Sequence, residues 1–150
     1  MIGVIVSEFN DFVTEKLLES CERGLHELKL EYKIVRVPGA FEIPLMAKKL
    51  SKKCSAIIAL GCLIEGKTDH YDMVCRACVD GIMRVQLATD VPIVFEVLMV
   101  RKMGDALMRV EKGYNAALVA YKLLNLNKNE TKNAPRSRSE RQKNTSKSRF

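Results

Sequence analysis

Residues 61–70, GCLIEGKTDH, contain side chains whose types and spacing could bind a phosphate group. Gly61, Gly66, Lys67 and Thr68 fit G-x-x-x-x-G-K-[ST], the phosphate loop of nucleotide triphosphatases. The context of that motif is also present, because an apolar run of strand type precedes the loop and a helical pattern follows it. One hypothesis is therefore that the chain binds and hydrolyses ATP or GTP.

The same segment fits a second hypothesis, a strand-to-helix turn that binds an anionic substrate beside a histidine. The first turn of a helix offers unpaired backbone N–H groups and the positive end of the helix dipole, and Lys67 and Thr68 would add to the attraction. His70 follows within that turn, where an imidazole that titrates near neutrality could protonate a phosphate leaving group. Its alternative role is to cap its own helix. Leu63 and Ile64 favour this second hypothesis, because a phosphate loop usually carries small residues at such positions.

Alternating strand and helix patterns place this turn in a parallel α/β domain. The predicted strands cover residues 3–7, 32–37, 56–60 and 93–98. The predicted helices cover residues 11–28, 44–52, 69–88, 102–109 and 113–124, and Asn10 or Asp11 caps the first of them. Each crossover must return the chain to the same end of the sheet, so we expect a four-stranded parallel sheet with helices on both faces.

Ligands of such sheets bind beyond the carboxyl ends of the strands, so the residues there are the candidates for a site. Phe9 and Phe41 follow the first two strands, and Phe95 lies in the fourth. In a chain with 6% aromatic residues, three phenylalanines at one edge indicate a site for a flat ring, although they could also simply fill the sheet edge. The fourth strand offers a triphosphatase only Glu96 as a magnesium ligand, mid-strand among apolar neighbours. Arg109 is either a bidentate phosphate clamp or a surface charge.

The composition indicates a cytoplasmic globular domain over residues 1–126. Hydrophobic residues make up 47% of the chain and charged residues 29%, which suits one soluble core rather than a disordered chain. The longest apolar runs are far shorter than the roughly 20 residues of a membrane span. Five cysteines without a secretory leader indicate reduced thiols, and the C-x-x-C pair Cys75 and Cys78 lacks the second pair that a structural zinc requires. We therefore expect no metal and no membrane association.

Residues 127–150 form a basic tail that we predict to be disordered. This segment holds eight Lys or Arg residues against two Glu, which accounts for +6 of the net charge of +7. It is rich in Asn, Ser and Thr, so it cannot repay the entropy of ordering by burying apolar surface. Because the rest of the chain is nearly neutral, the charge indicates a solubilising extension rather than specific nucleic-acid binding.

The chain resembles the lumazine synthases of riboflavin biosynthesis over residues 4–126. Two motifs carry the resemblance, the octapeptide VPGAFEIP at residues 37–44 and the spaced pattern G-x-x-I-x-G-x-T-x-H at residues 61–70. The FNDF sequence at residues 9–12, the run at residues 92–95 and Arg109 follow the order of the family. Lys67 stands at a position that varies in this family, and it would turn the family's loop into a chance match to a phosphate loop.

The resemblance implies a flavodoxin-like three-layer α/β/α fold and a transferase. The reaction would condense 5-amino-6-(D-ribitylamino)uracil with 3,4-dihydroxy-2-butanone 4-phosphate to 6,7-dimethyl-8-ribityllumazine, phosphate and water, with no metal or organic cofactor. By position, His70 would shuttle protons. The substrate-binding residues would be Phe9, Ala40, Phe41, Glu42, Cys62, Leu63, Ile64, Lys67, Thr68, Phe95 and Arg109.

The resemblance also implies that the site is shared between the subunits of a homopentamer. Phe9 would stack on the pyrimidine, and Lys67 and Thr68 would bind the phosphate ester at the helix start, while Phe95 and Arg109 would reach the site from an adjacent subunit. Whether pentamers build a larger shell, and whether they associate with riboflavin synthase, stays open. So does the alternative of an inactive flavin- or pterin-binding protein. The chain departs from the family pattern at Glu65, where a base is usual, and in a short segment after Arg109.

Overall fold

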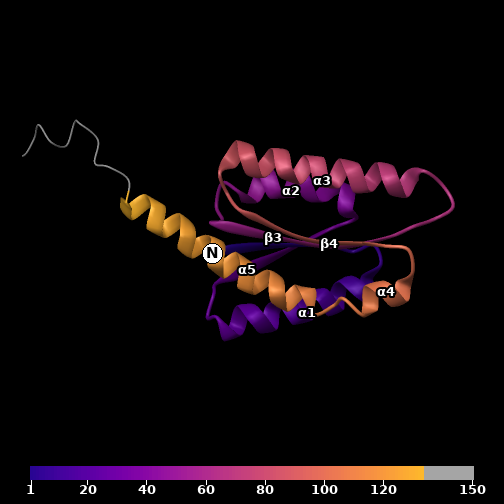
Figure 1. Cartoon of the computed structure of the whole chain (residues 1–150), viewed down its shortest axis with the longest axis horizontal. Helices are drawn as coiled ribbons and strands as arrows, with labels where there is room; N and C mark the ends of the chain where they lie inside the picture. The colour runs from indigo at the N-terminus through magenta and orange to yellow at the C-terminus, as the bar shows by residue number, and fades with distance from the viewer. Residues whose placement is uncertain (134–150) are drawn as a thin grey trace, which may run out of the picture.

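The computed structural model describes residues 1–133, which form a parallel sheet between two layers of helices (Figure 1). The strands are β1 (Ile2–Ser7), β2 (Tyr32–Val37), β3 (Ala56–Ile64) and β4 (Ile93–Val100), in the order β2-β1-β3-β4. The helices are α1 (Asp11–Glu27), α2 (Ile43–Leu50), α3 (His70–Thr89), α4 (Met103–Leu107) and α5 (Lys112–Asn133), and a short 3-10 turn, η1 (Ala40–Glu42), precedes α2. The predicted three-layer α/β/α fold with a four-stranded parallel sheet is confirmed.

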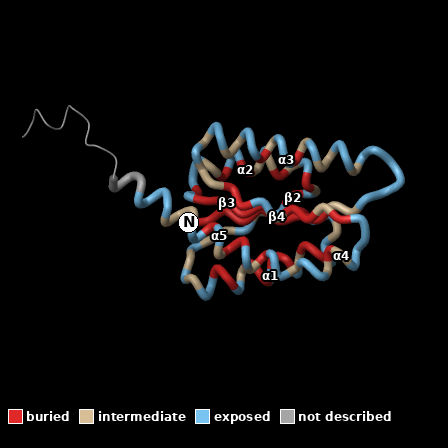
Figure 2. The backbone as a smooth tube through the Cα atoms, in the orientation of Figure 1, coloured by how far each residue is buried: buried red, intermediate tan, exposed pale blue. Residues whose placement is uncertain are grey.

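Strands β1, β3 and β4 are largely buried on both faces, which explains why they read as apolar runs (Figure 2). The edge strand β2 is less buried, and Ile34 and Arg36 in it are exposed. All six residues of β1 are buried, and β1 pairs in parallel with β2 on one side and β3 on the other. β3 in turn pairs in parallel with β4 from Ile57 to Ile64. The four carboxyl ends therefore lie at one edge of the sheet.

Alternate residues of the strands supply the two main cores, and a third, smaller cluster joins α1 and α4 to the ends of β3 and β4. On one face Val4, Val6 and Ile58 pack with side chains of α1 and α5, which lie together below the sheet in Figure 1. On the other face Ile5 and Ile57 pack with side chains of α2 and α3. This alternation is the period of two that a strand imposes on its side chains.

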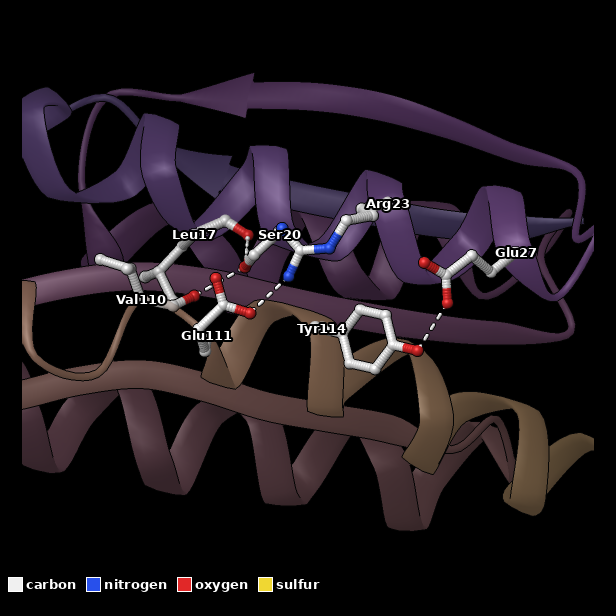
Figure 3. Close-up of polar contacts among 7 residues, drawn as sticks. All are labelled: Leu17, Ser20, Arg23, Glu27, Val110, Glu111 and Tyr114. Carbon is white, nitrogen blue, oxygen red and sulfur yellow. Dashed lines mark hydrogen bonds and ion pairs between the residues drawn. The ribbon is translucent and has the colours of Figure 1, made fainter.

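The contact between α1 and α5 is unusually close because small residues line it. A Cβ atom on Gly24 would lie 2.8 Å from the Cβ of Ala117, and a Cβ atom on Gly113 would overlap the Leu17 carbonyl oxygen. Polar contacts run along the same seam, among them the bond from the Tyr114 hydroxyl to Glu27 Oε2 at 2.6 Å (Figure 3). The seam fixes the register of α5 on α1.

Three elements extend beyond their predicted ends. β3 continues four residues past the predicted 56–60, and β4 ends at Val100 instead of residue 98, because the two strands pair with each other as far as Ile64 and Val100. α5 continues past residue 124 to Asn133, so residues 127–133 of the predicted tail are helical. The rest of that tail, residues 134–150, lies outside the described residues. Within the described part of the chain, none of the helices is long and apolar enough to span a bilayer.

Candidate active site

A cavity of about 800 Å³ opens at the carboxyl edge of the sheet. Its walls come from the segments that follow β1 and β2, from the end of β3 and from the first two turns of α3. The lining residues are Phe9, Pro38, Gly39, Ala40, Phe41, Glu42, Cys62, Leu63, Ile64, Gly66, Thr68, His70, Tyr71, Met73, Val74 and Ala77. The cavity therefore brings together Phe9, Ala40, Phe41, Glu42, Cys62, Leu63, Ile64, Thr68 and His70 of the predicted site.

The segment after β1 is fixed to the floor of the cavity by Asn10. This residue adopts a left-handed conformation with φ of 60°, which asparagine tolerates better than most residues. Its side-chain amide donates a hydrogen bond to the Cys62 carbonyl oxygen at 2.9 Å, and the backbone N–H of Phe9 donates to the Pro38 carbonyl oxygen at 3.0 Å. The Phe9 ring is 67% exposed, so it stands at the rim as an accessible apolar surface.

The turn after β2 is closed by Glu42. One carboxylate oxygen of Glu42 accepts a hydrogen bond from the backbone N–H of Gly39 at 2.9 Å, and the Glu42 backbone N–H is 3.3 Å from the Gly39 carbonyl oxygen. This closed turn buries Ala40 and leaves the Phe41 ring 62% exposed beside the cavity. Two exposed phenylalanine rings in one cavity wall form a surface suited to a flat heterocycle.

The course of β3 contradicts the phosphate-loop hypothesis. Gly61 would be the first residue of that loop, but it is buried in the sheet and pairs with Val97 of β4. A Cβ atom there would lie 3.0 Å from Ser7 Oγ and 3.1 Å from Val97 Cγ1, so a larger residue would require these side chains to shift. Only residues 65–69 connect β3 to α3, which is too short for the loop that the motif describes. The match to the motif is therefore a coincidence of spacing.

The start of α3 can receive an anion at one end of the cavity. α3 begins at His70, and among the described residues none caps its start with a side-chain hydrogen bond. Its first backbone N–H groups and the positive end of its dipole are therefore open to a ligand. Thr68 and His70 line the cavity here, whereas Lys67 is exposed and lies outside the lining residues.

One face of α3 forms a wall that the sequence predictions did not include. Met73, Val74 and Ala77 follow His70 at spacings of three, four and seven residues, so all four side chains lie on one helix face. Tyr71 also lines the cavity, and its burial, together with the neighbouring Cys75, raises the pKa of its phenol above the usual value. Helical spacing counted from His70 groups these residues on one face, but it does not show that the face borders a cavity.

Phe95 and Arg109 lie apart from the cavity of the same subunit. Phe95 lies on β4, which is an edge strand among the described residues, and its ring is 36% exposed. Arg109 follows α4, where its guanidinium Nη1 donates to the Asp105 carbonyl oxygen at 2.6 Å. Both residues are exposed, and neither lines the cavity. Phe95 is the third residue of β4, so the prediction that it lies with Phe9 and Phe41 at the carboxyl ends of the strands is wrong.

Glu65, at which the chain departs from the family pattern, and Glu96 of β4 each form an ion pair. Glu65 lies 3.5 Å from Arg101 Nε, and its backbone N–H donates to the Val100 carbonyl oxygen at 2.9 Å. Glu96 is 3.7 Å from Lys112 Nζ. Burial of Glu96 raises the pKa of its carboxyl group, and the nearby Lys112 ammonium opposes that shift.

Other groups could be considered as metal ligands, but the described residues contain no cluster of three or more His, Cys, Asp or Glu side chains suited to a metal ion. Cys75 and Cys78 both lie on α3 as free thiols. Burial raises the pKa of the Cys62 thiol, which lines the cavity, to about 11, so this sulfur is protonated at neutral pH.

Comparison with known protein families shows which family this chain belongs to. A sequence model of the family described as 6,7-dimethyl-8-ribityllumazine synthase matches residues 1–128. The match covers all the residues that line the cavity, from Phe9 to Ala77. The chain therefore belongs to the 6,7-dimethyl-8-ribityllumazine synthase family, which is a family of transferase enzymes.

Proposed function

We propose that this protein is an active 6,7-dimethyl-8-ribityllumazine synthase. It condenses 5-amino-6-(D-ribitylamino)uracil with 3,4-dihydroxy-2-butanone 4-phosphate and releases phosphate and water, a step of riboflavin biosynthesis. One observation carries the proposal: a single cavity of about 800 Å³ combines exposed phenylalanine rings with an open helix start and a histidine. These are the features that a flat pyrimidine and a phosphate ester need.

Each substrate has a place in this cavity. The pyrimidine ring stacks on Phe9, and its ribityl chain lies along Ala40 to Glu42 and Cys62 to Ile64. The phosphate ester binds at the start of α3, with Thr68 as a hydroxyl donor and Lys67 as a nearby cation. This arrangement places the two reactants side by side with the phosphate next to His70.

The chemistry needs positioning and proton transfer more than activation. The 5-amino group attacks the ketone carbon and loss of water gives an imine, elimination breaks the C–O bond to phosphate, and attack by the ribityl-bearing nitrogen closes the ring with loss of water. His70 delivers protons to the leaving oxygens and accepts them from carbon and nitrogen. Holding the two reactants in line supplies most of the acceleration, because it replaces a bimolecular encounter.

The complete site needs a second subunit, and we place the protein in a homopentamer in the cytoplasm. Support comes from a second face of α3, where Val79, Met83 and Leu87 recur every fourth residue and are exposed, Leu87 to 72%. Apolar side chains in such a row favour contact with another protein surface. In that assembly Phe95 covers the pyrimidine of a neighbouring subunit, and Arg109 binds its phosphate ester.

Product formation tests the proposal. Purified full-length protein is mixed with the two substrates, and the fluorescence of the lumazine product is followed with time. The proposal requires continuous turnover with one phosphate released for each lumazine formed. Tight binding of the pyrimidine or of the product without turnover would contradict it and would instead support an inactive flavin- or pterin-binding protein.

A further inference from the structure

The turn that carries Arg109 is attached to the middle of α1 by a buried hydroxyl group (Figure 3). Ser20 Oγ lies 2.6 Å from the Val110 carbonyl oxygen and 2.9 Å from the Leu17 carbonyl oxygen. Ser20 is 2% exposed, so water does not compete for this contact. The shorter of the two contacts joins α1 to a residue 90 positions later in the chain.

Close packing of Gly113 on α1 holds the same turn. Gly113 is buried against α1, and a Cβ atom there would overlap both the Leu17 carbonyl oxygen and Ser20 Oγ. The Gly113 backbone N–H is 3.2 Å from the Val110 carbonyl oxygen. Val110 is therefore fixed between Ser20 and Gly113, and the turn cannot slide along α1 without losing these contacts.

The backbone of Arg109 is tied to the residues on both sides of it. Its N–H donates to the Ala106 carbonyl oxygen at 2.9 Å, and its carbonyl oxygen accepts from the Lys112 N–H at 3.0 Å. Because Val110 follows directly, the Ser20 contact sets the position of the Arg109 backbone relative to α1.

α1 links this turn to the cavity. The helix starts directly after Asn10, whose amide donates to the Cys62 carbonyl oxygen at the cavity floor, and Phe9 precedes it at the rim. The first turn of α1 thus adjoins the cavity, and its third turn, at Ser20, contacts the segment that carries Arg109. In a ring of subunits, α1 sets the spacing between a subunit's own cavity and the guanidinium that it presents to its neighbour.

We propose that Ser20 is a positioning residue for Arg109: by holding Val110 on α1, its hydroxyl sets the place of the guanidinium that binds the phosphate ester. The inference rests on the proposed function. Binding of a phosphate by arginine depends on the geometry of its fixed fork of donors, so a small displacement of the turn weakens phosphate binding specifically.

A control contact lies on the same seam. The Tyr114 hydroxyl donates to Glu27 Oε2, so it too joins α5 to α1 through one side-chain hydrogen bond. It lies beyond Gly113 and has no contact with the Arg109 turn among the bonds of the described residues. Tyr114→Phe removes one exposed side-chain hydrogen bond between the same two helices and keeps the ring that Arg23 covers, so we expect it to leave the Arg109 turn in place.

The test is a double-mutant cycle between Ser20→Ala and Arg109→Gln, measured as steady-state kinetics of lumazine formation by the full chain. We expect Ser20→Ala to raise the KM for the phosphate substrate about three- to tenfold, the factor that corresponds to one net hydrogen bond, with the KM for the pyrimidine nearly unchanged. Tyr114→Phe leaves both constants near those of the wild type. In the Arg109→Gln background, Ser20→Ala adds no further increase.

Several results would overturn the inference while leaving the proposed function intact. These are an unchanged phosphate KM in Ser20→Ala, an equal rise in both KM values, or the same rise with and without Arg109. If Ser20→Ala does not fold, Ser20→Cys carries the same prediction at a smaller factor, since a thiol is a weaker donor. Absence of any lumazine from the wild-type protein would instead overturn the proposed function, and the inference with it.

Discussion

The chain has two histidines in different surroundings, so the one away from the cavity serves as a control for the one that lines it. His70 is exposed at the cavity beside Thr68, whereas His26 lies on α1 with its Nε2 2.9 Å from the Tyr32 hydroxyl. We predict that His70→Ala lowers kcat about 10- to 1,000-fold, the usual size of acid-base assistance, while the free energy of unfolding stays unchanged because the side chain is exposed. His26→Ala should keep full turnover. Equal losses in the two variants, measured by product fluorescence, would contradict a special role for His70.

Glu96 should make the stability of the fold depend on pH in a predictable direction. Burial raises its pKa in the folded state, so folding disfavours the charged carboxylate. The stability linked to this group is complete below its ordinary pKa and falls as the pH rises through the raised folded value. We therefore predict that Glu96→Gln is more stable than the wild type at pH 7, with the difference shrinking as the pH falls to 4.

Urea denaturation of both proteins at the two pH values measures this difference. A less stable Glu96→Gln at pH 7 would show that the pair with Lys112, whose Nζ is 3.7 Å away, outweighs the cost of burying the carboxylate.

At the scale of the elements, two glycines test whether the α1–α5 seam is as tight as its geometry indicates. A Cβ atom on Gly113 meets a backbone carbonyl that cannot move aside, whereas nothing lies within 4 Å of a Cβ atom on Gly104 in α4. We predict that Gly113→Ala lowers the free energy of unfolding by about 1 to 3 kcal/mol or more. Gly104→Ala should be neutral or stabilising by up to about 1 kcal/mol, because alanine favours helix.

Thermal unfolding of these two variants is the measurement. A Gly113→Ala protein as stable as the wild type would mean that α5 can move away from α1, which would also weaken the positioning role of Ser20.

The order of the elements could be predicted from the sequence because their periods differ, but some of their ends could not. β-branched residues mark 56–60, while Gly61 and Cys62 have little strand preference of their own. They extend β3 because β4 lies alongside and supplies partners as far as Ile64. Pairing between strands distant in the chain has no local sequence signal. The predicted strand therefore ended too early, and strand residues 61–64 were taken for part of a phosphate loop.

The site residues that could be predicted are those whose place follows from the nearby sequence. Phe9, Phe41 and His70 directly follow strands or begin a helix, so the general rule for parallel sheets located them. Met73, Val74 and Ala77 were missed because apolar residues on a helix usually face the core, and only the position of α3 shows that this face borders a cavity. Helix α5 passed its predicted end because Asn and Lys residues interrupt the apolar pattern without stopping the helix.

At the scale of the whole molecule, the exposed apolar face of α3 and the edge strand β4 should be covered in solution. We predict that replacing Met83 and Leu87 by Asp yields smaller particles, since each charge would have to be buried in a subunit contact. The turnover number should fall together with the particle mass, because the cavity of a dissociated subunit lacks Arg109 from its neighbour. Leu126→Asp on α5, at a residue that is 60% exposed, is the control for an apolar-to-acid change. Light scattering and activity measured together decide the point, and an unchanged mass with full activity would contradict it.

The most direct test of the central claim is a crystal structure of the full chain with the pyrimidine substrate and inorganic phosphate. We expect the pyrimidine against the Phe9 ring, the phosphate at the start of α3 within hydrogen-bond distance of Thr68, and the His70 imidazole turned toward the space between them. An imidazole directed away from both ligands, or ligands bound elsewhere on the protein, would contradict it.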